Sequence, residues 1–228
     1  GGSGGHTNLQ VVTPAPQQLP LPALIGATTT PRCILSDAHR TEILRHLPPS
    51  LALCDWTLRY STEQHGCSLR TALMRLDGRG PSLLAVLDSN GHLFGGFASE
   101  PLKVGSAFFG DNQSFVYTVQ GTGRGAQPAA VHRAKGADDH LVYLNKDMHE
   151  LPNGLAFGGQ LDDRFFGLWI HDNLESGRSV AGCATYRSPV LSSTAHSLTV
   201  TWPVALNVYT NASPKPPKST AAGASAAA

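Results

Sequence analysis

Short apolar runs separated by turn-forming residues dominate the middle of the chain, and this pattern predicts strands. Trp56, Leu58 and Tyr60 alternate with polar residues, as expected of a half-buried strand. Residues 83–87 and 93–97 are apolar and flank Asn90-Gly91, a pair that favours a β-hairpin turn. Further strands are predicted at residues 115–119, 141–144, 155–157, 166–170, 183–186, 198–202 and 204–209.

Two segments show the spacing of amphipathic helices instead. Ser36 is a suitable N-cap for one helix, and Pro48-Pro49 is expected to end it. Ser68 is a suitable N-cap for a second helix, whose apolar residues follow at i, i+3, i+4 and i+7: Leu69, Ala72, Leu73 and Leu76. Because strands outnumber helices and short turns join them, the sheets are predicted to be mostly antiparallel.

Composition divides the chain of 228 residues into a folded part and two flanking segments. Residues 1–32 are rich in Gly and Pro and are predicted to form an extended arm. Residues 210–228 contain no Val, Ile, Leu, Met or aromatic residue, so a Pro/Ala-rich tail is expected there. One folded domain is predicted at 33–209, with a Gly/Ala-rich surface loop at 120–139.

The charge balance argues against several classes of partner. Lys and Arg number 17 and Asp and Glu number 16, which gives 17 − 16 = +1. A nucleic-acid footprint needs a clustered cationic excess, so none is expected. The longest apolar run has about five residues, far too few for membrane insertion. With no sign of a secretory leader in the sequence, the cytoplasm is the expected location.

Neither a metal site nor a cofactor site is predicted. The four cysteines show no CxxC pairing, which argues against zinc: Cys33, Cys54, Cys67 and Cys183. The glycine-rich segment 121–125 lacks the following helix that a phosphate site needs, so a flexible loop is favoured. The densest titratable cluster, Asp138-Asp139-His140, is interpreted as a solvated turn.

An enzymatic alternative rests on Ser61, His65 and Cys67. Ser61 and His65 place a hydroxyl and an imidazole four residues apart, but no nucleophile-elbow pattern surrounds them. The favoured interpretation is that both tie the strand end to the following helix by hydrogen bonds. A redox role for Cys67 is the other form of this alternative, because an imidazolium at His65 would lower the pKa of the thiol.

A series of motifs in a fixed order resembles the TLDc domain over about residues 36–209. It opens with Trp56-x-Leu58-x-Tyr60-Ser61-Thr62-x-x-His65-Gly66-x-Ser68-Leu69-x-Thr71. It continues with Gly80-Pro81-x-Leu83-Leu84-x-Val86-x-Asp88-x-x-Gly91, Phe94-Gly95-Gly96-Phe97-Ala98-Ser99-x-Pro101 and Phe109-Gly110-x-x-x-Ser114-Phe115. It ends with Phe157-Gly158-Gly159, Gly167-Leu168-Trp169, Leu174-x-x-Gly177-x-Ser179 and Cys183-x-Thr185-Tyr186.

The resemblance implies an α+β fold, in which two mostly antiparallel β-sheets pack as a sandwich with flanking helices. It also implies a non-enzymatic interaction module that docks on a large cytosolic assembly, the vacuolar-type proton ATPase, with a role in resistance to oxidative stress. The family has no settled catalytic residues, so no catalytic role is carried over. The signature residues expected to be structural or to contact a partner are Ser61, Thr62, His65, Gly66, Phe109, Gly158, Gly159 and Trp169.

In one alternative the chain is still an interaction module, but it binds a different assembly. The chain would then be a structural component of a filament or of an axonemal microtubule in a cilium or flagellum. Its Pro-rich arm and Ala-rich tail would act as tethers.

The glycine cluster after Phe157 is shorter than in the family pattern, and at two other places an acidic residue of the pattern is replaced by an amide. The chain has Asn112-Gln113 where relatives commonly read Gly-Glu, and Asn207-Val208-Tyr209 where they read Glu-Val-Trp. Amide side chains form hydrogen bonds but cannot act as a base near neutral pH. These departures therefore argue against an activity that depends on either carboxylate.

Overall fold

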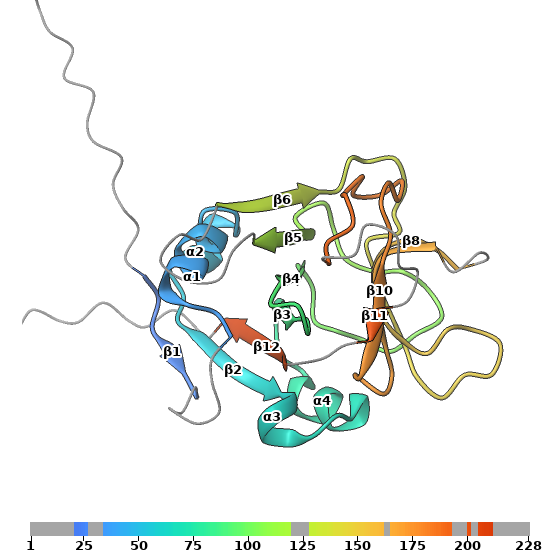
Figure 1. Cartoon of the computed structure of the whole chain (residues 1–228), viewed down its shortest axis with the longest axis horizontal. Helices are drawn as coiled ribbons and strands as arrows, with labels where there is room; N and C mark the ends of the chain where they lie inside the picture. The colour runs from blue at the N-terminus through green and yellow to red at the C-terminus, as the bar shows by residue number, and fades with distance from the viewer. Residues whose placement is uncertain are drawn as a thin grey trace, which may run out of the picture.

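Two β-sheets face each other and make up most of the molecule (Figure 1). The computed structural model describes residues 21–26, 34–119, 128–161, 165–192, 200–201 and 205–211. The larger sheet lies on the left of Figure 1 and the smaller sheet on the right. This arrangement confirms the α+β sandwich that the resemblance implies.

The larger sheet has seven strands in the order β1-β2-β12-β3-β4-β5-β6. Its strands are β1 (Leu24–Ile25), β2 (Trp56–Ser61), β12 (Ala205–Asn211), β3 (Ser82–Leu87), β4 (Leu93–Ala98), β5 (Phe115–Val119) and β6 (Ala129–Arg133). Every pair is antiparallel except β1–β2, which is parallel. The last strand in sequence, β12, therefore lies between two early strands.

The smaller sheet is antiparallel throughout, in the order β11-β10-β9-β8-β7. Its strands are β11 (Val200–Thr201), β10 (Ser176–Ser179), β9 (Phe165–His171), β8 (Gly154–Gln160) and β7 (Val142–Asn145). At the β7 edge, Phe109 and Val142 exchange two main-chain hydrogen bonds of 2.8 and 3.0 Å. The segment around Phe109 therefore covers this edge, which would otherwise present unpaired backbone groups.

In the part of the chain that the structure describes, four short helices flank the sheets: α1 (Asp37–Leu44), α2 (Pro49–Ala52), α3 (Thr62–His65) and α4 (Leu69–Leu76). The hydroxyl oxygens of Ser36 and Ser68 accept the N–H of the third residue of α1 and α4, which confirms both predicted caps. Helix α1 ends at Leu44, before the two prolines. Pro49 occupies the first turn of α2, where a backbone N–H would have no partner within the helix.

The core is divided among three layers. Apolar residues between the two sheets form the largest cluster, which includes Leu84, Val116, Phe157 and Leu168 and is extended by α4. A second cluster fills the outer face of the larger sheet beneath α1 and α2. A third cluster is aromatic and covers the outer face of the smaller sheet, with Tyr143, Phe166 and Trp169. The void that remains in the inter-sheet layer beside α4 is about 20 Å³, so no ligand fits there.

A β-bulge in β2 sets the direction of the residues that follow it. Tyr60 lies opposite Val208, whereas Leu58 lies opposite Tyr209, so Arg59 is the extra residue. Such an insertion reverses the alternation of side chains along a strand. Leu58 consequently packs on the outer face of the larger sheet, and Tyr60 packs between the sheets.

Two predictions are wrong, and the reasons are local. Residues 183–186 form turns rather than a strand, because Arg187 N–H donates to Cys183 O at 2.8 Å and turns the chain back. Cys183, Thr185 and Tyr186 are buried, and their spacing in the sequence resembles that of a strand, which explains the wrong prediction. The predicted loop at 120–139 contains strand β6, whose small residues gave little apolar signal.

The boundaries of the sheet differ slightly from those drawn on composition. Strand β1 lies within the stretch where an extended arm is predicted, and β12 continues to Asn211. Arg40 holds the β1 segment from α1, because its guanidinium donates to Pro22 O at 2.7 Å. The rest of the predicted arm, the predicted tail beyond residue 211, Cys33 and the glycine-rich segment 121–125 lie outside the described residues.

Candidate functional site

The turn that follows β2 contains four of the eight signature residues and is closed by hydrogen bonds. The main-chain N–H of Ser61 donates to Nδ1 of His65 at 3.1 Å. The ring of Tyr60 stacks on the His65 ring, with centroids 5.6 Å apart. The Tyr60 hydroxyl donates to Gly66 O and accepts the N–H of Ser68 at 3.2 Å. Strand β2, helix α3 and the start of α4 are thereby fastened to one another.

Ser61 and His65 do not form a nucleophile and a base in this geometry. Ser61 is 1% exposed, so its hydroxyl offers no access to a substrate. The imidazole Nδ1 already accepts a main-chain N–H, and a catalytic base must instead reach the hydroxyl. Burial lowers the pKa of His65, and the nearby Arg75 lowers it further, so the ring is neutral at pH 7.

Asp88, the carboxylate of the family motif at residues 80–91, has a structural role. Asp88 follows β3, and β12 separates that strand from β2. Its Oδ1 accepts the N–H groups of Asn90 and His92 at 2.9 and 2.8 Å. Asp88 therefore fixes the hairpin turn between β3 and β4.

Thr62 and Gly66 also act in the framework. The Thr62 hydroxyl oxygen accepts the N–H of Leu206 at 3.0 Å, which ties the turn to the start of β12. Gly66 ends α3 at φ 74°, in the left-handed region that favours glycine. The structure thus supports the interpretation that this motif joins a strand end to the next helix.

The other four signature residues belong to the smaller sheet and do not converge on the turn. Gly158 and Gly159 adopt φ angles of 67° and 117°, and a Cβ on either would lie within 2.7 Å of a neighbouring atom. Trp169 stacks on Phe166 with centroids 4.8 Å apart, and Phe109 pairs with the β7 edge. The eight residues are therefore distributed over two sheets rather than gathered into one site.

A partly buried hydrogen-bond network includes Asp138 and His140 of the Asp138-Asp139-His140 cluster. The Thr185 hydroxyl donates to Asp138 Oδ1 at 2.8 Å and accepts the N–H of Gly159 at 3.2 Å. His140 Nδ1 lies 2.8 Å from the Gly159 carbonyl oxygen. The cluster therefore holds the 183–187 turn against β8. Within the described ranges, no three His, Cys, Asp or Glu residues are placed to hold a metal ion.

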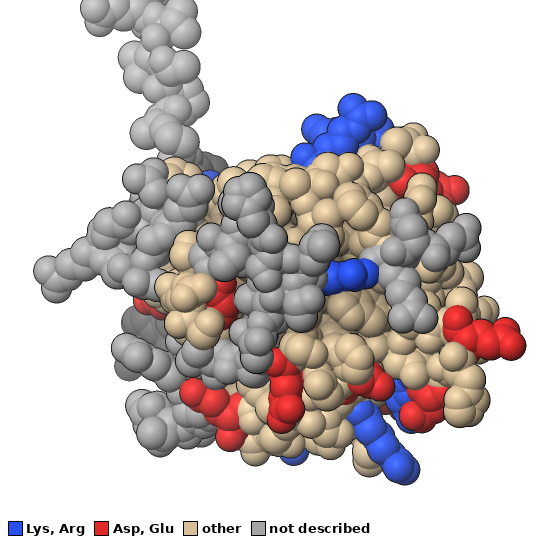
Figure 2. All heavy atoms as spheres, turned by 45° about the vertical axis from the view of Figure 1, so that its right-hand side comes forward, with Lys and Arg blue, Asp and Glu red and all other residues tan. Residues whose placement is uncertain are grey.

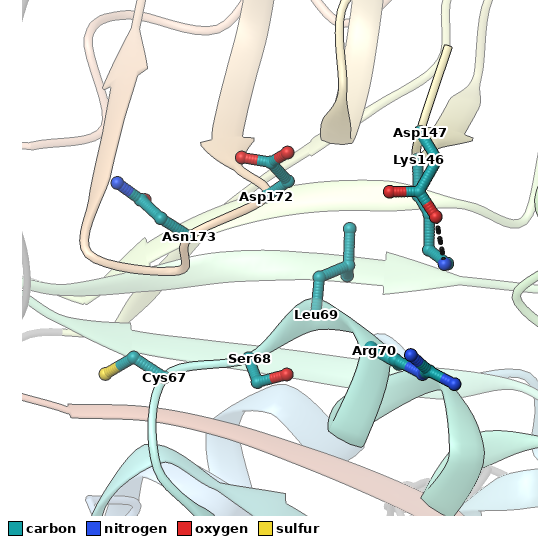
Figure 3. A pocket seen from close by; sticks show the side chains of 8 residues that line it. All are labelled: Cys67, Ser68, Leu69, Arg70, Lys146, Asp147, Asp172 and Asn173. Carbon is teal, nitrogen blue, oxygen red and sulfur yellow. Dashed lines mark hydrogen bonds and ion pairs between the residues drawn. The ribbon is translucent and has the colours of Figure 1, made fainter.

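Two adjoining hollows lie along α4, beside the loops that follow β7, β9 and β4. The first, which we call the Cys67 hollow, measures about 360 Å³ and is lined by Cys67, Ser68, Leu69, Arg70, Lys146, Asp147, Asp172 and Asn173 (Figure 3). The second, the α4 hollow, measures about 510 Å³ and is lined by Arg70, Leu73, Met74, Asp77, Leu102, Lys103, Val104 and Lys146. Arg70 and Lys146 line both, so the two hollows adjoin each other.

The hollows differ in character. Figure 3 shows Leu69 between the start of α4 and the two loops that carry Lys146-Asp147 and Asp172-Asn173, so polar groups surround the Cys67 hollow. The α4 hollow is lined by four apolar residues, three cations and one carboxylate. Lys103 pairs with Glu100 at 2.9 Å and Lys146 pairs with Asp147, whereas Arg70 forms no ion pair with any described residue.

Charge elsewhere on the surface is mixed. Figure 2 shows acidic and basic side chains interspersed over the face turned to the viewer. Within the part of the chain that the structure describes, no helix has the length and apolar character to cross a membrane.

Cys67 is exposed at the margin of the Cys67 hollow, yet its surroundings do not activate it. Partial burial raises the pKa of the thiol, and the carboxylate of Glu175 raises it further. His65 carries no charge at neutral pH and so supplies no compensating field. A reactive cysteine needs the opposite surroundings, with positive charge close to the sulfur.

We expect the alkylation rate of Cys67 to reach half its maximum at a pH above that of an ordinary thiol, which is about 8.5. The reason is that only the thiolate reacts and its fraction is suppressed here. Peptide-resolved mass spectrometry after timed iodoacetamide labelling across pH measures this midpoint at Cys67 alone. A midpoint below about 7.5 would contradict this account and favour the redox alternative.

The sequence analysis named Leu73 among the apolar residues of the predicted helix but missed Arg70, Met74 and Asp77, which also line the α4 hollow. Arg70, Leu73, Met74 and Asp77 recur at i, i+3, i+4 and i+7, a second stripe beside the buried one. That spacing was visible in the sequence, and two adjacent apolar residues in it were the available signal. The contribution of Val104 and Lys146 could not be predicted from the sequence, because loops from distant segments bring these residues to the hollow.

Comparison with known proteins gives one family. The model of the TLDc domain matches residues 28–202. Mouse "MTOR-associated protein MEAK7" is 35% identical over 178 residues, which cover 73% of this chain and 37% of the relative. The Danio rerio protein of the same name is 37% identical over 184 residues, or 78% and 38% of the two chains. Mouse "Oxidation resistance protein 1" is 33% identical over 186 residues, or 81% and 20%. The chain thus spans less than two fifths of the length of these relatives.

Proposed function

The chain belongs to the TLDc domain family, and from this premise we propose that it is a non-enzymatic interaction module that docks on a large protein assembly in the cytosol. The observation that carries the proposal is the closed turn after β2. Ser61, His65 and Tyr60 are the residues that most resemble catalytic machinery, and their recorded hydrogen bonds hold the framework together.

The surface supports the same proposal. The void beside α4 in the inter-sheet layer measures only about 20 Å³, which is too small for a substrate. The larger hollows along α4 are open and combine exposed apolar and charged groups, a mixture typical of protein contacts rather than of enclosed small-molecule sites.

We further propose the vacuolar-type proton ATPase as the assembly, with a role in resistance to oxidative stress. The family resemblance suggests the ATPase. The name of the relative "Oxidation resistance protein 1" is consistent with the second part. The name of the MEAK7 relatives refers to association with mTOR. An mTOR complex is therefore the second assembly that the experiment should look for.

Affinity purification of the full chain from native lysate tests the proposal. We expect quantitative mass spectrometry to find the proton ATPase subunits enriched well above a tag-only control. Enrichment of axonemal tubulin without the ATPase would favour the structural alternative, and enrichment of mTOR components without the ATPase would favour the second complex. Recovery of no assembly at all would contradict the proposal.

A further inference from the structure

Helix α4 presents two stripes that face different surroundings. Leu69, Ala72 and Leu76 are at most 7% exposed and pack between the sheets. The second stripe, formed by Arg70, Leu73, Met74 and Asp77, lines the α4 hollow. A surface helix normally turns a polar face to solvent, so apolar residues on the outward side need an explanation.

Exposed apolar side chains gather at this hollow. Among the described residues, six large apolar side chains are exposed, and two of them lie here: Met74 is 74% exposed and Val104 is 49% exposed. Half-buried Leu73 and Leu102 continue the apolar floor into the inter-sheet core. Single exposed apolar residues are ordinary, but a contiguous patch indicates a contact surface, and methionine adapts readily to a partner.

Cations share the lining of the α4 hollow with these apolar residues. Arg70, Lys103 and Lys146 line the α4 hollow, against one lining carboxylate, Asp77. The pairs that Lys103 and Lys146 form with Glu100 and Asp147 lie at the surface, where such pairs contribute little and exchange readily. Arg70 is exposed and has no ionic partner among the described residues. A docked group with carboxylates near Arg70 and Lys146 would complement these cations.

The elements that line the α4 hollow favour a helical partner over an extended peptide. They are a helix and two loops, namely α4 and the segments at 102–104 and 146, rather than a strand edge. An extended peptide would find no sheet edge with which to pair its backbone, whereas a helix satisfies its own backbone groups and needs only a groove for its side chains.

We propose that the α4 hollow is a docking site for an amphipathic α-helix of a partner protein, with an apolar stripe over Leu73, Met74 and Val104 and acidic residues facing Arg70 and Lys146. The site deepens the proposed interaction role and rests on it. Eight residues of α4 span about 12 Å, so about two turns of the partner are engaged. Such a contact binds weakly alone and serves as one part of a larger interface.

Two synthetic helical peptides of about 20 residues, a length at which isolated helices become stable, test the proposal on the full chain. Both carry the same Leu stripe, and they differ only in whether Glu or Lys flanks it. We expect the Glu peptide to bind at least about fivefold more tightly than the Lys peptide, the scale of one or two surface charge contacts. Amide chemical shifts should move on α4 and at residues 102–104 and 146.

Variants of the chain sharpen the test. Arg70→Glu should reverse the preference between the two peptides, and Met74→Glu should weaken the Glu peptide by about tenfold. Both side chains are exposed, so the fold should survive. Leu53→Glu is the matched control, because Leu53 is 66% exposed and does not line either hollow. The control should bind as the unmodified chain does.

Several results would overturn the inference. These are equal affinity for the two peptides, shifts confined to another surface, binding that survives Met74→Glu, or a chain that self-associates in sedimentation until Met74 is changed. If the ATPase co-purifies but the two peptides bind the chain equally, the docking site is wrong and the proposed function stands. If the peptides bind as expected but no assembly co-purifies, the proposed function is wrong and the docking site stands.

Discussion

Gly159→Ala should destabilise the protein by about 3–5 kcal/mol, the sum expected for backbone strain and forced overlap. Gly159 adopts φ 117°, and an added Cβ would lie 2.0 Å from the carbonyl oxygen of Phe165. That oxygen belongs to the neighbouring strand β9, so neither strand can move without breaking the ladder. Gly159 also donates to Thr185 and accepts from the His140 ring, so the 183–187 turn would shift with it. Urea denaturation measures the loss.

Gly80→Ala is the matched control for this prediction. A Cβ at Gly80 would have nothing within 4 Å, and its backbone lies outside the left-handed region. The control should change the free energy of unfolding by no more than about 0.5 kcal/mol. Equal midpoints for the two variants would show that β8 tolerates displacement at Gly159.

Asn207→Glu should lower the free energy of unfolding by about 3 kcal/mol or more at pH 7, as expected for an unpaired charge placed in a buried site. Asn207 is 1% exposed, its Nδ2 donates to the Tyr209 hydroxyl at 3.0 Å, and its Oδ1 has no partner among the described residues. The two departures of β12 from the family pattern thus contact each other. In this chain the amide of Asn207 pairs with the hydroxyl of Tyr209. In the family pattern a carboxylate takes the place of the amide, and an indole N–H donor takes the place of the hydroxyl.

The pH dependence identifies the charge as the cause. Burial would raise the pKa of the introduced carboxyl in the folded state above its unfolded value of about 4.3. Below that pH the acid is neutral in both states and the penalty disappears; above it the penalty grows by about 1.4 kcal/mol per pH unit until the folded pKa is reached. Asn207→Gln has the same shape without the charge and should show a smaller loss that does not change with pH.

A double variant tests the pairing itself. Adding Tyr209→Trp to Asn207→Glu should recover part of the lost stability, because an indole N–H can donate to the carboxylate. Thermal unfolding of the four variants of the cycle measures the coupling free energy. Coupling near zero would mean that the two departures arose independently of each other.

Local chemistry explains which parts of the fold were predictable. The caps at Ser36 and Ser68 and the Asn90-Gly91 hairpin depend on residues within a few positions, and all three were found. Strand β10 was not predicted, because its sequence Ser-Gly-Arg-Ser has no alternation of apolar and polar residues. Its place depends on the distant partners of Ser179, whose hydroxyl donates to Gly167 O at 2.8 Å and accepts the N–H of Leu191 at 2.9 Å.

The same distinction applies to the candidate site. Ser61 and His65 lie close together in sequence, and their role in tying the end of β2 to the following helix could be inferred from the sequence, whereas the bond of Thr62 to Leu206 could not. The α4 hollow could not, because segments after β4 and β7 supply half of its walls. Whether Met74 is exposed or covered depends on those segments, and nothing near it in sequence specifies them.

The position of β12 determines when the larger sheet can form during synthesis. Strands β2 and β3 each pair with β12 rather than with each other, and the hydrogen bond from Leu206 to Thr62 spans 144 residues. At 5–20 residues per second the ribosome needs roughly 7–30 s to make that interval. For most of this time the nascent chain carries β2 and β3 without their shared neighbour. A chaperone that shields these strands during translation would therefore raise the yield of native protein more than one acting on the finished chain.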